Sequence, residues 1–229
     1  MNNEVQEFEV LKKINELEST KRQFTRFYEP WWNEKCKDYK GGSLSDHYDL
    51  FFSRFVTYNA LYNVIVRTKE RTGKLKKDKD RYGNIVERGD RKKAIDCMVK
   101  ELSAERSVLQ AFFTQPEITL NVKKLEEMLD DEEFGVFFDG GGHNPEGDKK
   151  ILRNLKNNKL ESRMRGVLTF LYQVRCNLFH GAKGYENTQI QVLKTLNVIL
   201  EKIVEILFER FQKFIEAEIE MLKIGRAHV

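Results

Sequence analysis

Residues 172–184 read YQVRCNLFHGAKG and close a run in which apolar residues recur at helical spacing. The run predicts an amphipathic helix that ends near Gly181 and Gly184, because glycine commonly follows the last turn of a helix. Inside it, Arg175, Asn177 and His180 form a polar trio in apolar surroundings. The apolar stripe consists of Val167, Phe170, Leu171, Val174 and Leu178.

The trio has the chemistry that phosphodiester bonds require. Arginine is a permanent cation whose shape suits phosphate oxygens, and histidine exchanges a proton near neutral pH. At about 100° per residue, Arg175 lies on one flank of the helix and Asn177 and His180 lie on the other, so Arg175 and His180 are roughly 140° apart. Both reach one phosphate only if the helix unwinds at Gly181 or if two copies of the chain share a site.

The same spacing recurs along the rest of the chain and predicts an all-α protein. The 229 residues suit a single domain, here taken as residues 1–223, and only 3 are proline. We expect Pro30 to end the first helix and Asp46 to cap the second. The last helix is apolar over a wide arc, which predicts a central position. The expected helices are 4–27, 46–72, 90–113, 122–129, a tract from 149 into the trio, and 186–223.

Composition limits the class of protein. The net charge of +4 is compatible with an RNA partner, and no apolar run approaches the roughly 20 residues of a membrane span. The start of the chain lacks the layout of a signal peptide, and three separated cysteines form no disulfide framework, so we expect a cytoplasmic protein. Residues 224–229, IGRAHV, can be encoded by the start of a common sequencing adapter and are taken as a non-native tail.

Residues 71–93 form a basic stretch with interspersed glycines, predicted as a long loop between helices. Its cations are candidates to bind an RNA backbone. The alternative is a solvated loop in which aspartate and glutamate cancel part of the charge. The cations proposed to bind RNA are Lys74, Lys76, Lys77, Lys79 and Arg81.

Three other features are interpreted as structural. Trp31 and Trp32 favour core packing over a base-stacking surface. The glycine-rich loop at 140–142 lacks the ending of a phosphate-binding loop, and His143 after it is expected to be exposed. The acidic cluster at 130–133 has no further ligands at metal spacing, so neither a metal nor another cofactor is expected.

Two stretches resemble the HEPN superfamily of all-helical domains. Arg175 and His180, with Asn177 and an apolar pair between them and Gly181 after them, are similar to its Arg-x4-6-His signature. Residues 54–63, RFVTYNALYN, resemble the aromatic early helix with asparagine found in several of its families. In many active members the residue directly after the arginine is polar, often asparagine, whereas here it is cysteine and the asparagine comes one place later.

The resemblance implies a metal-independent endoribonuclease, typical of toxin–antitoxin and phage-defence systems, that works as a homodimer. His180 would act as general acid or base, Arg175 would hold the scissile phosphate, and Asn177 would orient His180. The products would carry a 2′,3′-cyclic phosphate and a 5′-hydroxyl. Two alternatives stay open: a non-catalytic helical module that binds RNA, a nucleotide or a protein such as an antitoxin, and a helical dimer whose trio is structural. For Asn59, a structural role and a role in the site are both considered.

Overall fold

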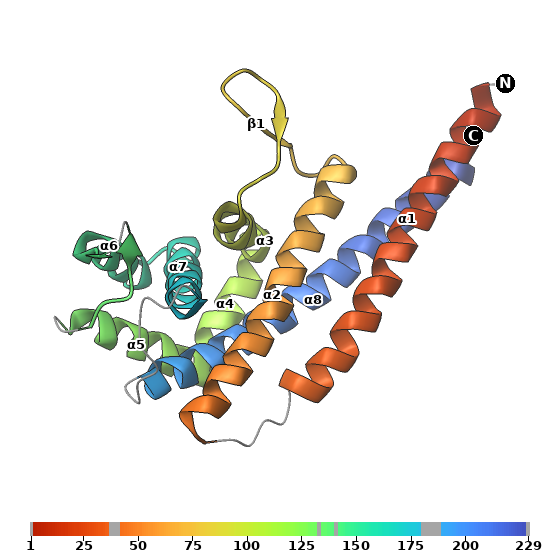
Figure 1. Ribbon diagram of the computed structural model, residues 1–229. Helices are drawn as coiled ribbons and strands as arrows, with labels where there is room; N and C mark the ends of the chain where they lie inside the picture. Colours follow the sequence, from red (N-terminus) through yellow and green to blue (C-terminus); the bar gives the residue numbers. More distant parts are fainter. Residues whose placement is uncertain (1, 37–41, 132–133, 140–141, 180–188, 228–229) are drawn as a thin grey trace.

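The computed structural model describes residues 2–36, 42–131, 134–139, 142–179 and 189–227, and it confirms an all-α fold (Figure 1). Two short hairpins pair β1 (Asp78–Lys79) with β2 (Ile85–Val86) and β3 (Phe138–Asp139) with β4 (Gly142–His143), both antiparallel. The helices are α1 (Asn2–Trp31), η1 (Trp32–Cys36), α2 (Leu44–Arg71), η2 (Lys92–Cys97), α3 (Met98–Ser103), α4 (Arg106–Thr114), α5 (Pro116–Asp130), α6 (Pro145–Leu155), α7 (Leu160–Phe179) and α8 (Gln189–Ala227).

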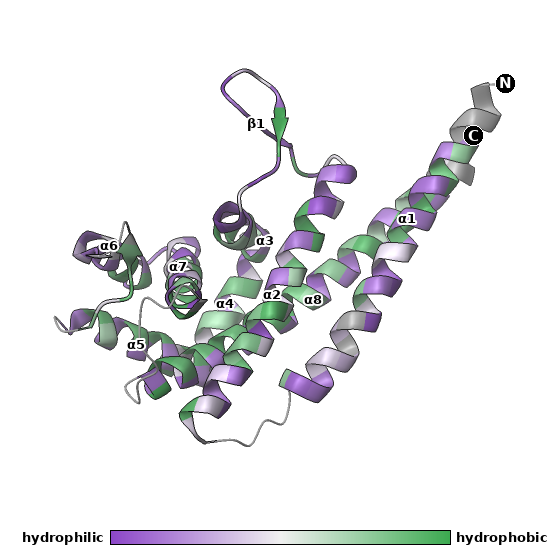
Figure 2. Ribbon diagram, viewed as in Figure 1, coloured by the Kyte–Doolittle hydropathy of each residue, from purple (hydrophilic) through white to green (hydrophobic). Residues whose placement is uncertain are grey.

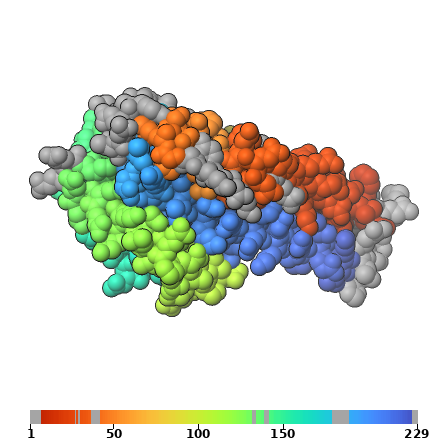
Figure 3. Space-filling model, turned by 90° about the horizontal axis from the view of Figure 1, so that it is seen from below, coloured from red at the N-terminus to blue at the C-terminus, as the bar shows by residue number. Residues whose placement is uncertain are grey.

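The long helix α8 lies at the centre of the fold, as its wide apolar arc predicted. It runs parallel to α2, because the amide of Asn197 donates to the His47 carbonyl at 3.0 Å and Lys74 pairs with Glu218 at 3.2 Å. Helix α1 lies along the C-terminal half of α8 in the opposite direction, and α5 packs against α8 as well (Figures 1 and 3). Hydrophobic residues gather where these helices face one another (Figure 2).

Aromatic rings join α1 to α8. The rings of Tyr28 and Phe208 stack with their centroids 3.8 Å apart, and Phe24 meets Phe211 edge-on at 5.6 Å. Trp32 is only 3% exposed and stacks on Tyr28, while the Trp31 indole donates to the Ser53 carbonyl at 3.2 Å. Both tryptophans therefore take part in helix packing, which agrees with the structural interpretation.

Several predicted helix boundaries were wrong, and the tract predicted from residue 149 into the trio is divided into α6 and α7. Pro30 lies within α1, although proline has no backbone N–H and so removes one helical hydrogen bond. The wider π-helical turn η1 begins directly after α1. Ser43, not Asp46, caps α2, and Asp46 completes a capping box by accepting from the Ser43 N–H at 2.9 Å. The predicted helix 90–113 is divided into η2, α3 and α4, with Glu105 extended at the break.

Helices α6 and α7 approach each other closely because Gly166 has no side chain. A Cβ at this position would lie 2.9 Å from the backbone nitrogen of Leu155 and 3.1 Å from the Asn154 Cβ. This contact fixes α7 against α6, and α7 carries the candidate site.

The end of α8 extends past the predicted limit of residue 223, and Ile224 is 53% exposed. Among the helices of the described ranges, none combines the length and the apolar character that crossing a membrane requires.

Candidate functional site

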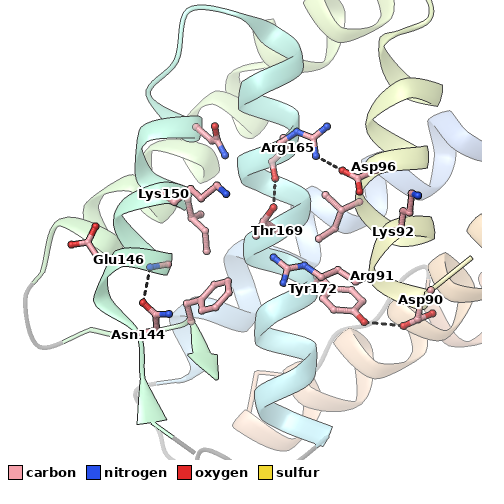
Figure 4. Close-up of a pocket in the computed structure, with 16 residues that line it drawn as sticks. Asp90, Arg91, Lys92, Asp96, Asn144, Glu146, Lys150, Arg165, Thr169 and Tyr172 are labelled. Carbon is pink, nitrogen blue, oxygen red and sulfur yellow. Dashed lines mark hydrogen bonds and ion pairs between the residues drawn. The ribbon is translucent and has the colours of Figure 1, made fainter. Parts of the chain in front are cut away.

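A cleft of about 960 Å³ lies beside α7 and is named here the α7 cleft (Figure 4). One wall is the face of α7 that carries Arg165, Thr169 and Tyr172, which are spaced i, i+4 and i+7. The start of η2 forms a second wall, and the start of α6 forms a third. A π-helical turn such as η2 is rare and often marks a functional site.

The α7 cleft contains both cations and acids. Arg165 pairs with Asp96, and Lys92 pairs with Asp78 at 2.8 Å. The Arg91 guanidinium lies 5.6 Å from the centre of the Phe137 ring. The side chains of Arg165 and Asp96 are 36% and 46% exposed, so their ion pair is weak. An anionic ligand can therefore displace the Asp96 carboxylate from Arg165 at little cost in free energy. The cations that line the cleft are Arg91, Lys92, Lys150 and Arg165.

At one end of the α7 cleft, Asp90 joins α2 to α7. It accepts hydrogen bonds from the hydroxyl of Tyr62 on α2 at 2.6 Å and from that of Tyr172 on α7 at 3.1 Å. Burial and the neighbouring Asp90 carboxylate raise the pKa of both tyrosines, so both stay protonated and donate at neutral pH. The aspartate thus holds the two helices at a fixed separation.

Arg175 lies at this same junction. Its guanidinium carbon is 5.6 Å from the centre of the Phe55 ring and 5.8 Å from that of the Tyr172 ring, and the residue is half-buried. Two stretches far apart in the sequence, residues 54–63 and the end of α7, therefore meet in the fold. Aromatic rings on two sides restrict where the guanidinium can point.

Asn59 lies between Phe55 and Tyr62 on α2 and is half-buried. Its side-chain oxygen accepts from the Asn63 amide at 2.7 Å, and the Asn63 oxygen in turn accepts from the buried ammonium of Lys93 at 3.1 Å. Asn59 therefore belongs to a chain of hydrogen bonds that ends at Lys93 of η2. These bonds give its side-chain oxygen a donor and a structural role at the edge of the site.

Asn177 points away from Arg175, as the helical spacing predicted. It is 5% exposed and donates its amide to the Val136 carbonyl at 2.8 Å, while Gln173 donates to the Phe138 carbonyl at 3.2 Å. These bonds hold β3 and the residues just before it against α7. His180, which Asn177 was predicted to orient, directly follows α7 and lies outside the described residues.

The residues predicted to bind RNA lie on and beside the β1–β2 hairpin, and the structure does not bring them to Arg175. Lys74 forms an ion pair with Glu218 on α8. Lys76, Lys77, Lys79 and Arg81 are exposed on the hairpin. The hairpin connects to the α7 cleft through the Lys92–Asp78 pair at its base.

Two groups were missed at the sequence level. Asp90 gave no signal, since its partners come from helices far away in sequence. The spacing of Arg165, Thr169 and Tyr172 on one helical face was a usable signal that went unnoticed.

His143 is largely exposed, as expected, but it has a buried partner. Its Nε2 lies 2.5 Å from an oxygen of Asp148, which also accepts from the Phe137 N–H at 2.8 Å. The pair closes the loop that leads into α6 and so supports one wall of the α7 cleft.

Within the part of the chain that the structure describes, no group of three or more His, Cys, Asp and Glu side chains is placed to hold a metal ion. Comparisons with protein-family models, with curated proteins and with solved structures give no match.

Proposed function

We propose that this chain binds RNA and cleaves its phosphodiester bonds with arginine and histidine side chains, as a metal-independent endoribonuclease. The observation that supports this best is the meeting of the two HEPN-like stretches. Arg175 packs on Phe55 of the first stretch, and Tyr172 and Tyr62 share one carboxylate. A cleft with four cationic side chains opens directly beside this junction.

In this proposal His180 removes the proton from an RNA 2′-hydroxyl, or donates one to the leaving group. The 2′-oxygen forms a bond to phosphorus, and the bond to the 5′-oxygen breaks. That oxygen takes up a proton and leaves as a hydroxyl, and water or the His180 of a second copy performs the proton transfer that the first His180 does not. Arg175 stabilises the charge that develops on the phosphate. Arg91 and Arg165 bind flanking phosphates in the α7 cleft.

The proposal includes a homodimer, and the opposite directions of Arg175 and Asn177 on α7 support it. Arg175 faces α2, whereas Asn177, three residues before His180, faces the segment at Val136. A second copy can supply the histidine that meets the arginine of the first. The proposal includes a cytoplasmic location, a toxin or phage-defence role, and a partner protein that restrains the activity.

A second candidate is a non-catalytic RNA-binding module. It is favoured by one observation: the Asn177 amide already donates to the Val136 carbonyl and is not available to orient His180 in that geometry. Binding of RNA without cleavage would identify this function.

Purified protein is expected to cleave single-stranded RNA in excess EDTA as fast as in magnesium. The reason is that neither arginine nor histidine needs a metal for this reaction. Analysis of the product ends should find 2′,3′-cyclic phosphate and 5′-hydroxyl groups. Cleavage that stops in EDTA, or products with a 5′-phosphate, would refute the mechanism.

A further inference from the structure

Residues 76–88 form a hairpin that projects beyond the helices and is named here the arm (Figure 1). We propose that the arm is a second RNA-binding site, in which lysines bind backbone phosphates and Tyr82 stacks on an unpaired base. This inference rests on the proposed function only in taking RNA as the ligand. It requires no cleavage.

Two of the three acidic side chains of the arm pair with cations at its base, whereas the third, Asp80, accepts hydrogen bonds only from neutral groups of the turn. Asp78 pairs with Arg88 at 2.8 Å and with Lys92 at 2.8 Å, and Glu87 pairs with Lys93 at 2.8 Å. The side chains of Arg88 and Lys93 are only 7% and 8% exposed. The charges of Asp78 and Glu87 are thus paired at the base, and only the Asp80 carboxylate remains to offset the four outer cations.

The outer cations of the arm are exposed and have no acidic partner among the residues that the structure describes: Lys76, Lys77, Lys79 and Arg81. Arg88 donates to the Lys76 carbonyl at 2.7 Å and so anchors the backbone that carries them. Closely spaced cations on an exposed hairpin suit the regular charge of a nucleic-acid backbone.

The tip of the arm is pre-organised. The Asp80 carboxylate accepts from the Tyr82 N–H at 2.8 Å and from the Asn84 N–H at 2.9 Å. The hydrogen bond from the Asn84 side chain, together with these backbone bonds, lowers the pKa of Asp80. Gly83 completes the turn with a φ of 87°, which favours glycine.

This turn presents Tyr82, which is 74% exposed, with the Arg81 guanidinium 4.8 Å from the centre of its ring. An exposed ring beside a cation is a stacking surface for any base. A single aromatic residue is sufficient here because the turn fixes its position.

The arm and the α7 cleft are continuous. Lys92 lines the cleft and pairs with Asp78 of β1, and Arg91 beside it also lines the cleft. A single strand held by the arm therefore has a cationic path to Arg165 and the junction at Asp90.

An acidic protein is the less favoured ligand. The exposed apolar residues on β2 are Ile85 and Val86, and two side chains fall far short of the roughly 800 Å² that each partner buries in a stable protein interface. Stacking on Tyr82 requires a flat ring system, which a nucleobase supplies.

Binding of a fluorescein-labelled, unstructured 2′-O-methyl RNA tests the arm, because this RNA lacks the attacking hydroxyl and stays intact. Its affinity is measured at several salt concentrations by fluorescence anisotropy. Log affinity falls linearly with log salt concentration, with a slope of about −0.7 for each phosphate contact on a single strand. Replacing the four outer cations by serine should therefore reduce the magnitude of this slope by about 3. Tyr82→Leu should weaken binding about tenfold, and Tyr82→Phe should bind like wild type.

The charge-matched control replaces four exposed lysines elsewhere, Lys12, Lys13, Lys123 and Lys223, by serine. If the arm variant behaves like this control and Tyr82→Leu binds like wild type, the arm proposal is wrong and the proposed function is untouched. Equal affinity for polyglutamate would also overturn it. RNA bound through the arm but never cleaved would sustain the arm and refute the nuclease, and absence of RNA binding by wild type would refute both.

Discussion

Replacing Arg175 with alanine should slow RNA cleavage by a factor of about 10² to 10³, the usual effect of removing one group that stabilises transition-state charge. The guanidinium packs against the rings of Phe55 and Tyr172, which restricts its position before RNA binds. Single-turnover cleavage with excess protein measures the chemical step. His180→Ala should give a loss at least as large, because the proposed mechanism assigns the proton transfer to this imidazole.

Two controls separate chemistry from folding in this experiment. Arg175→Lys keeps the charge but loses the planar fork, so it should recover part of the rate. The melting temperature of each variant, compared with Arg67→Ala at an exposed position of α2, reports any loss of stability. Arg175→Ala that cleaves at the wild-type rate would remove this residue from the mechanism.

Replacing Arg54 with alanine should lower the free energy of unfolding by about 3 kcal/mol, the lower end of the range for breaking a buried ion pair. Arg54 is 6% exposed and donates to the Asn197 carbonyl at 2.7 Å and to the Cys36 carbonyl at 2.8 Å. It also pairs with Glu201 at 2.6 Å. Its loss removes one hydrogen bond from each of two buried carbonyls and disconnects α2, η1 and α8. We choose the lower end because the Glu201 side chain is 35% exposed and water partly screens the pair.

Urea unfolding followed by circular dichroism measures this loss, with Arg67→Ala expected within about 0.5 kcal/mol of wild type. Burial raises the pKa of Glu201, and Arg54 opposes this increase, so the carboxyl should titrate at higher pH in the variant. A change of less than about 1 kcal/mol in Arg54→Ala would mean that packing, not the polar contacts, holds these helices together.

Much of the fold followed from helical spacing. The apolar arc of α8 predicted its central position, and the stripes predicted α1 and α2 within a few residues. The tract predicted from residue 149 into the trio is instead two helices, α6 and α7. The break at Glu105 was missed because tertiary contacts determine it: Arg210 of α8 binds the Glu105 carboxylate at 2.8 Å, and Phe112 and Phe113 are buried just beyond. Neither contact has a local signature.

The candidate site was predicted only in part. The sequence singled out Arg175 by its residue type and the aromatic face of α2 by its helical spacing, and the two are in contact in the fold. Asp90 was not, because its role comes from two tyrosines on different helices. Asn177 was predicted to orient His180, whereas its amide donates to the backbone carbonyl of Val136. Every residue has a backbone carbonyl, so the sequence holds no signal for this partner.

Crosslinking of RNA that carries 4-thiouridine, followed by identification of the modified peptides, tests most directly whether RNA occupies the α7 cleft. We predict crosslinks to peptides that contain Tyr82, Phe137 or Tyr172, and their loss when Arg91 and Arg165 are both replaced by serine. Crosslinks confined to the exposed faces of α1 or α5, unchanged by these substitutions, would contradict the account.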